Sequence, residues 1–308
     1  MRADQLTIAF NGEFERKVER GKDIPPFLRG IQEIRKVWPA PCGAPPNPSS
    51  IDGGTIEEIS GPTGKVPLLI FCPENARGVL LYLHGGGWSF GSHIADAGRW
   101  AKMAERIRAA IVSVGYRLAP ESPYPAAPND CETAALWLLE NSRNRFGSQK
   151  LAIGGFSAGA HLAVVTLVRL RDKHHISSFR SAILTSGQYD LRMTPSARAW
   201  GKRKLVLTSA LMKMAVDNFA NGQDLSDPDV SPIFSSLENL PPALFQVGTS
   251  DPFMDDTLFM AARWKAAGNE TQLSVCSEGS HYYAKSPTPD GEKARIESES
   301  FLSSTLSN

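Results

Sequence analysis

The hydrophobic positions of this 308-residue chain fall into short continuous runs that alternate with amphipathic segments. From about Thr55 onward the runs with strand character are TIEEIS, VPLLIFCP, GVLLYLH, AAIVSVGYRL, KLAIGGF, SAILTS, PALFQVG and TQLSVCSEG. Helical spacing appears in DCETAALWLLENSRNRF, AGAHLAVVTLVRLRDK and DDTLFMAARWKAAGN. Continuously apolar strands are typical of sheets buried on both faces. The pattern therefore predicts an α/β fold, with a mostly parallel central sheet flanked by helices on both faces.

The alternation is absent in two places. The first 50 residues hold a polar, helix-like stretch and then the proline-rich WPAPCGAPPNPSS, in which the prolines exclude a regular helix. Residues 191–236 are long, mixed in character and helical in part. An excursion of this kind inside a parallel-sheet fold is often a lid or cap, and a peripheral helical insertion without a function is the alternative.

A serine flanked by glycines stands directly after one of the expected strands, in IGGFSAGAH at 153–161. A strand, a tight turn and a helix carrying G-x-S-x-G form the context of a nucleophile elbow. The turn is so tight that neither Gly155 nor Gly159 can carry a bulky side chain. Ser157 would then project above the sheet at a helix N-terminus, where negative charge is favoured.

A second glycine-rich turn, HGGGW at 84–88, ends an earlier strand. Glycines let backbone N–H groups face a developing negative charge, so this turn is a candidate oxyanion site. The alternative of a phosphate site lacks support, because no G-K-[ST] or G-x-G-x-x-G pattern accompanies the glycines.

A serine nucleophile needs a base, and the base needs an orienting carboxylate. Of the six histidines, His281 lies in a loop after the last strand, at the edge where α/β active sites form. We expect His84 to order the glycine turn, His161 to pack, and the others to be structural or solvated.

Asp251 directly follows the strand ALFQVG, and the order Ser157, Asp251, His281 fits this fold. The other candidate acids are Asp190, which could border the pocket, and Asp255 and Asp256, which read as acids at a helix start.

Composition narrows the classes of function. A formal net charge of +1 offers no electrostatic footprint for nucleic acid, and no apolar run is long enough for a membrane span. The N-terminus lacks the apolar core of a signal peptide, so we expect a cytoplasmic protein with reduced thiols. The four cysteines form no C-x-x-C motif, and a metal site or organic cofactor is not expected.

Taken together, HGGGW, YRLAPE, GFSAGAHLA, SDPFMD and GSHYY resemble, in this order, the hormone-sensitive-lipase branch of the α/β-hydrolases. The resemblance implies a carboxylic ester hydrolase with Ser157 as nucleophile, His281 as base and Asp251 as its partner. It also implies oxyanion donors from the backbone of Gly86, Gly87 and Ala158, and a substrate that is a small ester with a short acyl chain. In domain terms it implies a catalytic core of 51–190 and 237–308, with 1–50 as an N-terminal cap segment and 191–236 as a cap insertion.

Two features depart from the pattern usual in that branch. The elbow there reads GDSAGG, whereas Phe156 and Ala160 stand here, and GxSAGAHLA is also similar to kynurenine formamidases. Hydrolysis of an aryl formamide or amide on the same triad is therefore the alternative activity. Trp88 and Phe156 are expected as apolar walls of the substrate pocket, with an ordinary core role as the alternative for both.

Two further expectations concern the oligomeric state and a third class of function. Beyond its ester substrate, the chain could pair with a second copy of itself as a homodimer. A binding protein with a decayed triad is a third class of function in this fold, and the intact serine, aspartate and histidine argue against it.

Overall fold

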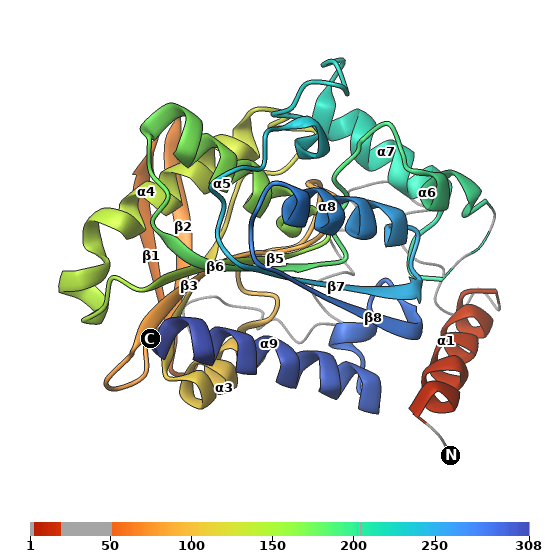
Figure 1. Ribbon diagram of the computed structural model, residues 1–308, viewed down its shortest axis with the longest axis horizontal. Helices are drawn as coiled ribbons and strands as arrows, with labels where there is room; N and C mark the ends of the chain where they lie inside the picture. The colour runs from red at the N-terminus through yellow and green to blue at the C-terminus, as the bar shows by residue number, and fades with distance from the viewer. Residues whose placement is uncertain (1–2, 20–50, 202, 204, 308) are drawn as a thin grey trace.

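The computed structural model describes residues 3–19, 51–201, 203 and 205–307, and one sheet lies at its centre (Figure 1). The sheet order is β1-β2-β4-β3-β5-β6-β7-β8. β2 pairs antiparallel with β1 and with β4, and the other pairings are parallel. The strands are β1 (Thr55–Gly61), β2 (Gly64–Phe71), β3 (Gly78–Leu83), β4 (Ala109–Val114), β5 (Leu151–Phe156), β6 (Phe179–Thr185), β7 (Ala243–Ser250) and β8 (Thr271–Ser280). The predicted mostly parallel α/β sheet is thus confirmed.

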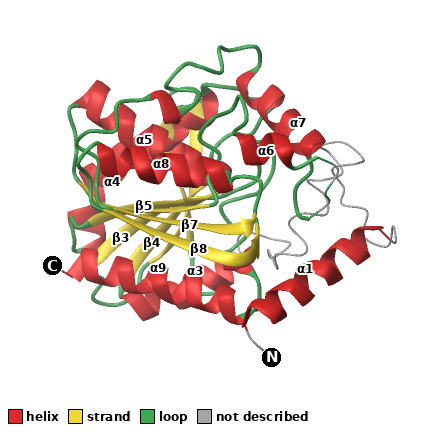
Figure 2. Ribbon diagram, turned by 45° about the vertical axis from the view of Figure 1, so that its right-hand side comes forward, coloured by secondary structure: helices red, strands yellow, loops and turns green. Residues whose placement is uncertain are grey.

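Helices cover both faces of the sheet (Figure 2). One face carries α4 (Ala126–Phe146), α5 (Ala158–His174) and α8 (Met254–Ala266), and the other carries α3 (Ala97–Ile107) and α9 (Pro289–Ser307). Successive side chains of a strand point to opposite faces. In β3, Leu81 and Leu83 join the core under α4 and α5, whereas Leu80 and Tyr82 join the core against α3 and α9. This double burial explains why the strands read as continuous apolar runs.

Helix α1 (Ala3–Glu19) lies beside β8 and α9 (Figure 1). The Thr7 hydroxyl donates a hydrogen bond to Asp290, and the Asn11 side chain donates to the Glu278 carbonyl. Glu15 forms an ion pair with Arg203, which belongs to the 191–236 insertion. Residues 20–50, the rest of the expected N-terminal cap segment, lie outside the described residues. Within the described part of the chain, no helix is both long and apolar enough to cross a membrane.

The 191–236 insertion contains α6 (Pro195–Ala199), α7 (Ser209–Ala220) and the short 3₁₀ helix η3 (Pro232–Phe234). Its first residues are fastened by the buried Asp256 of α8. One carboxylate oxygen of Asp256 accepts the N–H groups of Tyr189 and Asp190 at 2.7 and 2.9 Å, and the other accepts the Thr194 hydroxyl at 2.6 Å. Burial raises the pKa of this carboxyl to about 7.

This carboxyl makes the stability of the protein depend on pH. Because its folded-state pKa lies above the ordinary value of 3.8, the folded protein holds a proton that the unfolded chain has released in that window. The free energy of unfolding should therefore fall as pH rises from about 4 to about 7, by up to about 1.4 kcal/mol per pH unit. Asp256→Asn removes the titration and keeps an acceptor oxygen. In urea unfolding at pH 5 and pH 8, we expect wild type to lose more stability than Asp256→Asn, and equal losses would contradict the assignment.

The last residues of the insertion are fastened by Arg169 of α5, whose side chain is 3% exposed. Its guanidinium binds Asp229 at 2.5 and 2.7 Å, Glu132 at 2.9 Å and the Asn129 side chain at 2.9 Å. The Tyr124 hydroxyl also donates to Asp229, at 2.6 Å. A buried cation with this many acceptors holds the returning chain against α4 and α5.

Removing that cation should destabilise the protein strongly. Arg169→Met leaves two partly buried carboxylates without their partner, and breaking a buried pair costs about 3–5 kcal/mol. The matched control is Lys213→Met, because Lys213 forms an exposed pair with Asp217 on α7 that is worth at most about 0.5 kcal/mol. Urea denaturation measures both variants, and equal losses would show that the Arg169 cluster does not fasten the insertion.

Candidate active site

Three side chains that follow parallel strands meet at the same edge of the sheet. Ser157 follows β5, Asp251 follows β7 and His281 follows β8. The Ser157 Oγ lies 3.0 Å from Nε2 of His281, and Nδ1 of His281 lies 3.0 and 3.1 Å from the two carboxylate oxygens of Asp251. All three side chains are buried. The structure thus brings together the serine, histidine and aspartate that the sequence singles out.

The hydrogen-bond partners determine the proton positions in neutral His281. A carboxylate only accepts, so Nδ1 carries the proton and donates it to Asp251. Nε2 then accepts the hydroxyl proton of Ser157. Asp251 is itself held by the backbone N–H of Phe253, which donates to its Oδ1 at 2.9 Å. The imidazole is therefore oriented to remove a proton from the serine.

The turn that carries Ser157 is as tight as the sequence predicts. Ser157 has φ of 57°, a left-handed backbone that few residues with a side chain adopt. A Cβ at Gly159 would lie 1.9 Å from the carbonyl oxygen of Leu83 in β3, so α5 starts in direct contact with the neighbouring strand. The Ser157 N–H donates to the carbonyl of Thr185 at 2.9 Å, which ties the turn to β6.

The glycine turn after β3 is closed by hydrogen bonds to the carbonyl of its middle glycine. The Gly86 carbonyl accepts the N–H groups of Ser89 and Phe90, each at 3.0 Å. Since a trans peptide directs its N–H opposite to its C=O, the N–H of Gly87 faces away from that turn. Gly86 has φ of 130°, and a Cβ there would lie 2.0 Å from the Phe90 carbonyl oxygen. Among the described residues, none accepts a hydrogen bond from the N–H of Gly86, Gly87 or Ala158, so these donors are available.

Two other histidines support the glycine turn without joining the triad. His84 stacks on Tyr116 with ring centroids 4.1 Å apart, and the Tyr116 hydroxyl donates to the His84 carbonyl at 2.7 Å. His161 packs in the core, as expected, with Nε2 at 2.8 Å from the Val230 carbonyl. Burial lowers the pKa of both imidazoles to about 4, so both are neutral and serve as packing and hydrogen-bonding groups.

The alternative acids have other partners. Asp190 pairs with Arg192, Asp255 accepts the Ser196 N–H at 2.8 Å, and Asp256 holds the start of the insertion. Within the described residues, Asp251 is the carboxylate in hydrogen-bond contact with His281. The reading of Asp255 and Asp256 as acids at the start of a helix fits their place in the first turn of α8.

Trp88 has the surroundings of a core residue, which is the alternative role named for it. Its side chain is 1% exposed and stacks on Phe219 of α7 with centroids 4.6 Å apart. Its Nε1–H donates to Nδ1 of His161 at 3.2 Å. An indole buried with its N–H satisfied behaves as a core residue. Trp88 therefore joins the glycine turn, the elbow helix α5 and the insertion.

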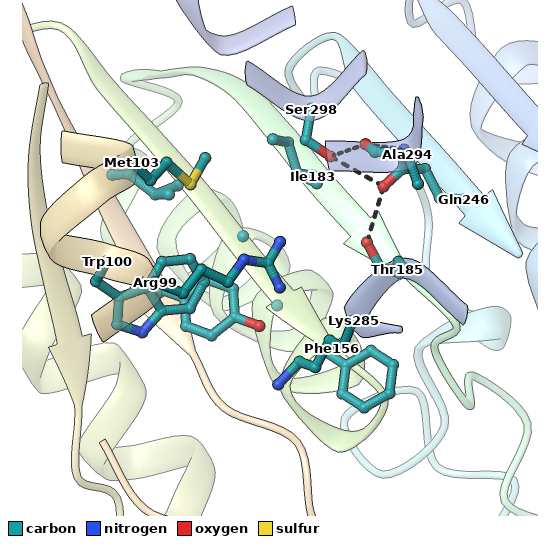
Figure 3. Close-up of a pocket in the computed structure, with 15 residues that line it drawn as sticks. Arg99, Trp100, Met103, Phe156, Ile183, Thr185, Gln246, Lys285, Ala294 and Ser298 are labelled. Atoms are coloured by element: carbon teal, nitrogen blue, oxygen red, sulfur yellow. Dashed lines mark hydrogen bonds between the residues drawn. The ribbon is translucent and has the colours of Figure 1, made fainter. Parts of the chain in front are cut away.

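Phe156 likewise lies among core residues. Its side chain belongs to the core on the α3 and α9 face and borders a cavity there (Figure 3). The ring centroid lies 4.9 Å from that of His281. Phe156 thus contacts the imidazole of His281 while it borders that cavity.

The insertion reaches the site at two points. The Ala215 side chain of α7 is so close to Gly87 that a Cβ on this glycine would lie 2.9 Å from it. Phe253 packs with Ala197 and Met212 of the insertion, and its ring lies 5.2 Å from the ring of His281. Sequence analysis did not single out Phe253 as a contact of the histidine, although it stands inside the SDPFMD motif beside Asp251.

Comparisons with known proteins agree with this fold. A family model described as alpha/beta hydrolase fold matches residues 80–285. The chain is 30% identical to a carboxylic ester hydrolase, LipN, of Mycobacterium tuberculosis over 250 residues, which are 78% of this chain and 66% of that protein. It is 29% identical to an ethyl acetate hydrolase of Pseudomonas putida over 277 residues, 86% of each chain. The structure of a hyperthermophilic esterase from Pyrobaculum calidifontis aligns with a TM-score of 0.82 and 27% identity, covering 91% of this chain and 92% of that one.

The matched segment contains the whole constellation, from the glycine turn at 84–88 through Ser157 and Asp251 to His281. Fold, motif order and homology thus lead to one assignment. The protein belongs to the α/β-hydrolase family, in its branch similar to hormone-sensitive lipase.

Proposed function

We propose that the protein is a serine carboxylesterase that hydrolyses small esters with short acyl chains through an acyl-enzyme. The observation that carries the proposal is the continuous hydrogen-bond chain from Ser157 through His281 to Asp251. Homology to named ester hydrolases supports the reaction class. The substrate and the residue roles below are part of the proposal.

In the first half-reaction, Oγ of Ser157 attacks the ester carbonyl while Nε2 of His281 accepts its proton. The Asp251 carboxylate stabilises the imidazolium that results. Negative charge develops on the former carbonyl oxygen, and the N–H groups of Gly86, Gly87 and Ala158 are its proposed donors. Loss of one such donor costs about 10²–10³ in rate.

Collapse of the tetrahedral intermediate completes the first half-reaction: it breaks the bond to the alcohol, which leaves with the proton from His281, and the acyl group stays on Oγ of Ser157. In the second half-reaction, water attacks the acyl-enzyme, and His281 takes its proton. The second tetrahedral intermediate releases the carboxylic acid and returns the proton to Ser157.

The position of the insertion close to the catalytic edge favours a small substrate. α7 rests on Gly87, and Phe253 with its partners from α6 and α7 packs beside His281, so little space separates the insertion from the catalytic edge. The relative from Pseudomonas putida that matches this chain over 86% of both lengths is named for ethyl acetate, an ester with a two-carbon acyl group. A cap formed by 191–236, together with the N-terminal segment, would set the length of chain that fits.

Substitutions in the triad test the mechanism. Ser157→Ala should lower kcat for p-nitrophenyl acetate by about 10⁴-fold or more, because the nucleophile is lost. Asp251→Asn should cost about 10³–10⁴-fold, because the imidazole loses the acceptor that sets its tautomer. Asp255→Asn, four residues along the chain and with no contact to His281, is the matched control and should cost little. Full activity in Ser157→Ala would refute the nucleophile, and the reverse order of the two aspartates would move the acid to Asp255.

A substrate panel tests the reaction class. The sequence similarity of GFSAGAHLA to kynurenine formamidases makes an aryl formamide the competing substrate. We expect kcat/KM to be highest for p-nitrophenyl acetate or butyrate, to fall for long acyl chains, and to be low for N-formyl anilines. Turnover of the formamide with inert esters would reverse the assignment while leaving the triad in place.

A further inference from the structure

Behind His281, on the face of the sheet covered by α3 and α9, lies a cavity of about 30 Å³ (Figure 3). Phe156 stands between this cavity and the histidine, with its ring 4.9 Å from the imidazole. The ring therefore borders unfilled space on this face of the sheet.

A buried cation lies beside the same ring and also lines the cavity. The Lys285 ammonium lies 4.9 Å from the centroid of the Phe156 ring and 5.6 Å from that of Tyr282. The two rings meet edge to face with centroids 5.7 Å apart. An ammonium over an aromatic ring is attracted by its negative face, and more so away from water. Figure 3 shows Lys285 and Phe156 together at one end of the cavity, with the Arg99 guanidinium nearby.

The lysine is itself held by Asp96, which lies just before α3. Its ammonium donates to the Asp96 carboxylate at 2.5 Å, and the two side chains are only 12% and 14% exposed. Burial acts to lower the pKa of Lys285, but the Asp96 carboxylate together with Tyr82 and Tyr282 outweighs it, and the net pKa is raised. Burial likewise acts to raise the pKa of Asp96, but Lys285 together with Arg99 outweighs it, and that pKa is lowered. Both groups stay charged, and the pair links α3 to the segment after His281.

That segment is short and begins at the catalytic base. Residues 282–285 follow His281 directly, and the Lys285 N–H donates to the Tyr282 carbonyl at 3.0 Å. His281 is thus held at Nδ1 by Asp251 and from behind by Phe156. A shift of the ring into the cavity would let the imidazole move away from Ser157.

We propose that Lys285, paired with Asp96, is a positioning residue for catalysis. Its ammonium holds the Phe156 ring against His281 and so keeps Nε2 at hydrogen-bond distance from Ser157. Lys285 touches neither substrate nor the reacting atoms. The proposal rests on the proposed function, because it takes His281 to be the general base.

Single substitutions give the first test. Lys285→Met removes the charge and keeps an unbranched side chain, and we expect kcat for p-nitrophenyl acetate to fall about tenfold with KM changed less than about twofold, since misplacing a catalytic group costs rate. Lys285→Arg keeps the cation and should retain most of the rate. Lys293→Met, at an exposed lysine of α9, is the matched control. Wild-type kcat in Lys285→Met, or a loss expressed only in KM, would overturn the proposal.

A double-mutant cycle tests the route through the ring. In a Phe156→Leu background the ammonium has no Phe156 ring to hold, so Lys285→Met should lower kcat by much less than it does in wild type. Equal losses in the two backgrounds would contradict the proposal. If Lys285→Met does not fold, Asp96→Asn breaks the same ion pair from the other side, and wild-type kcat in that variant would overturn the proposal equally.

Labelling by a p-nitrophenyl phosphonate, located by mass spectrometry, separates this proposal from the proposed function. Failure to label Ser157 in wild type would refute the nucleophile, whatever Lys285 does. Labelling of Ser157 in every variant, at rates that follow kcat, supports the positioning role. Labelling at one rate in wild type and Lys285→Met would refute the positioning role and leave the esterase assignment intact.

Discussion

The architecture of the site depends on one close approach, that of the first turn of α5 to the end of β3. Gly159 lies against the Leu83 carbonyl at a distance that leaves no room for a side chain. This contact forces Ser157 into a left-handed backbone and lifts its hydroxyl above the sheet. It also places the helix N-terminus beside the glycine turn that continues from β3. Nucleophile and proposed oxyanion donors are therefore positioned by the same backbone crossing.

A second level of organisation holds the insertion over this crossing. Its two ends are fastened by buried polar side chains on the helices of one face, Asp256 at the start and Arg169 at the return. Between them, α7 rests on Trp88 and on the glycine turn. Hydrogen bonds give these anchors direction, since each side chain requires particular N–H groups, hydroxyls or carboxylates as partners.

The sequence predicts the sheet and the triad well because both depend on local signals. Apolar runs mark buried strands, and glycines mark the turns at which Ser157 and the oxyanion loop stand. It leaves the surroundings of these side chains open. Trp88 and Phe156 can each be read as a pocket wall or as a core residue, and the structure places one in the core beneath α7 and the other against His281 on the opposite face of the sheet. Which side an aromatic residue faces depends on partners distant in the sequence, and the pairing of Lys285 with Asp96 spans 189 positions.

The contact between Ala215 and Gly87 has a consequence for engineering. Cap segments of related enzymes are attractive parts to exchange when a new substrate is wanted. Here the transplanted helix would have to bring a small residue to the position of Ala215 and an aromatic ring to that of Phe219, because the glycine turn and Trp88 are shaped to receive them. A chimera chosen only for the shape of its pocket would disturb the glycine turn at 84–88 through its contact with α7. An exchange of this segment that alters substrate selectivity would therefore also alter the catalytic rate.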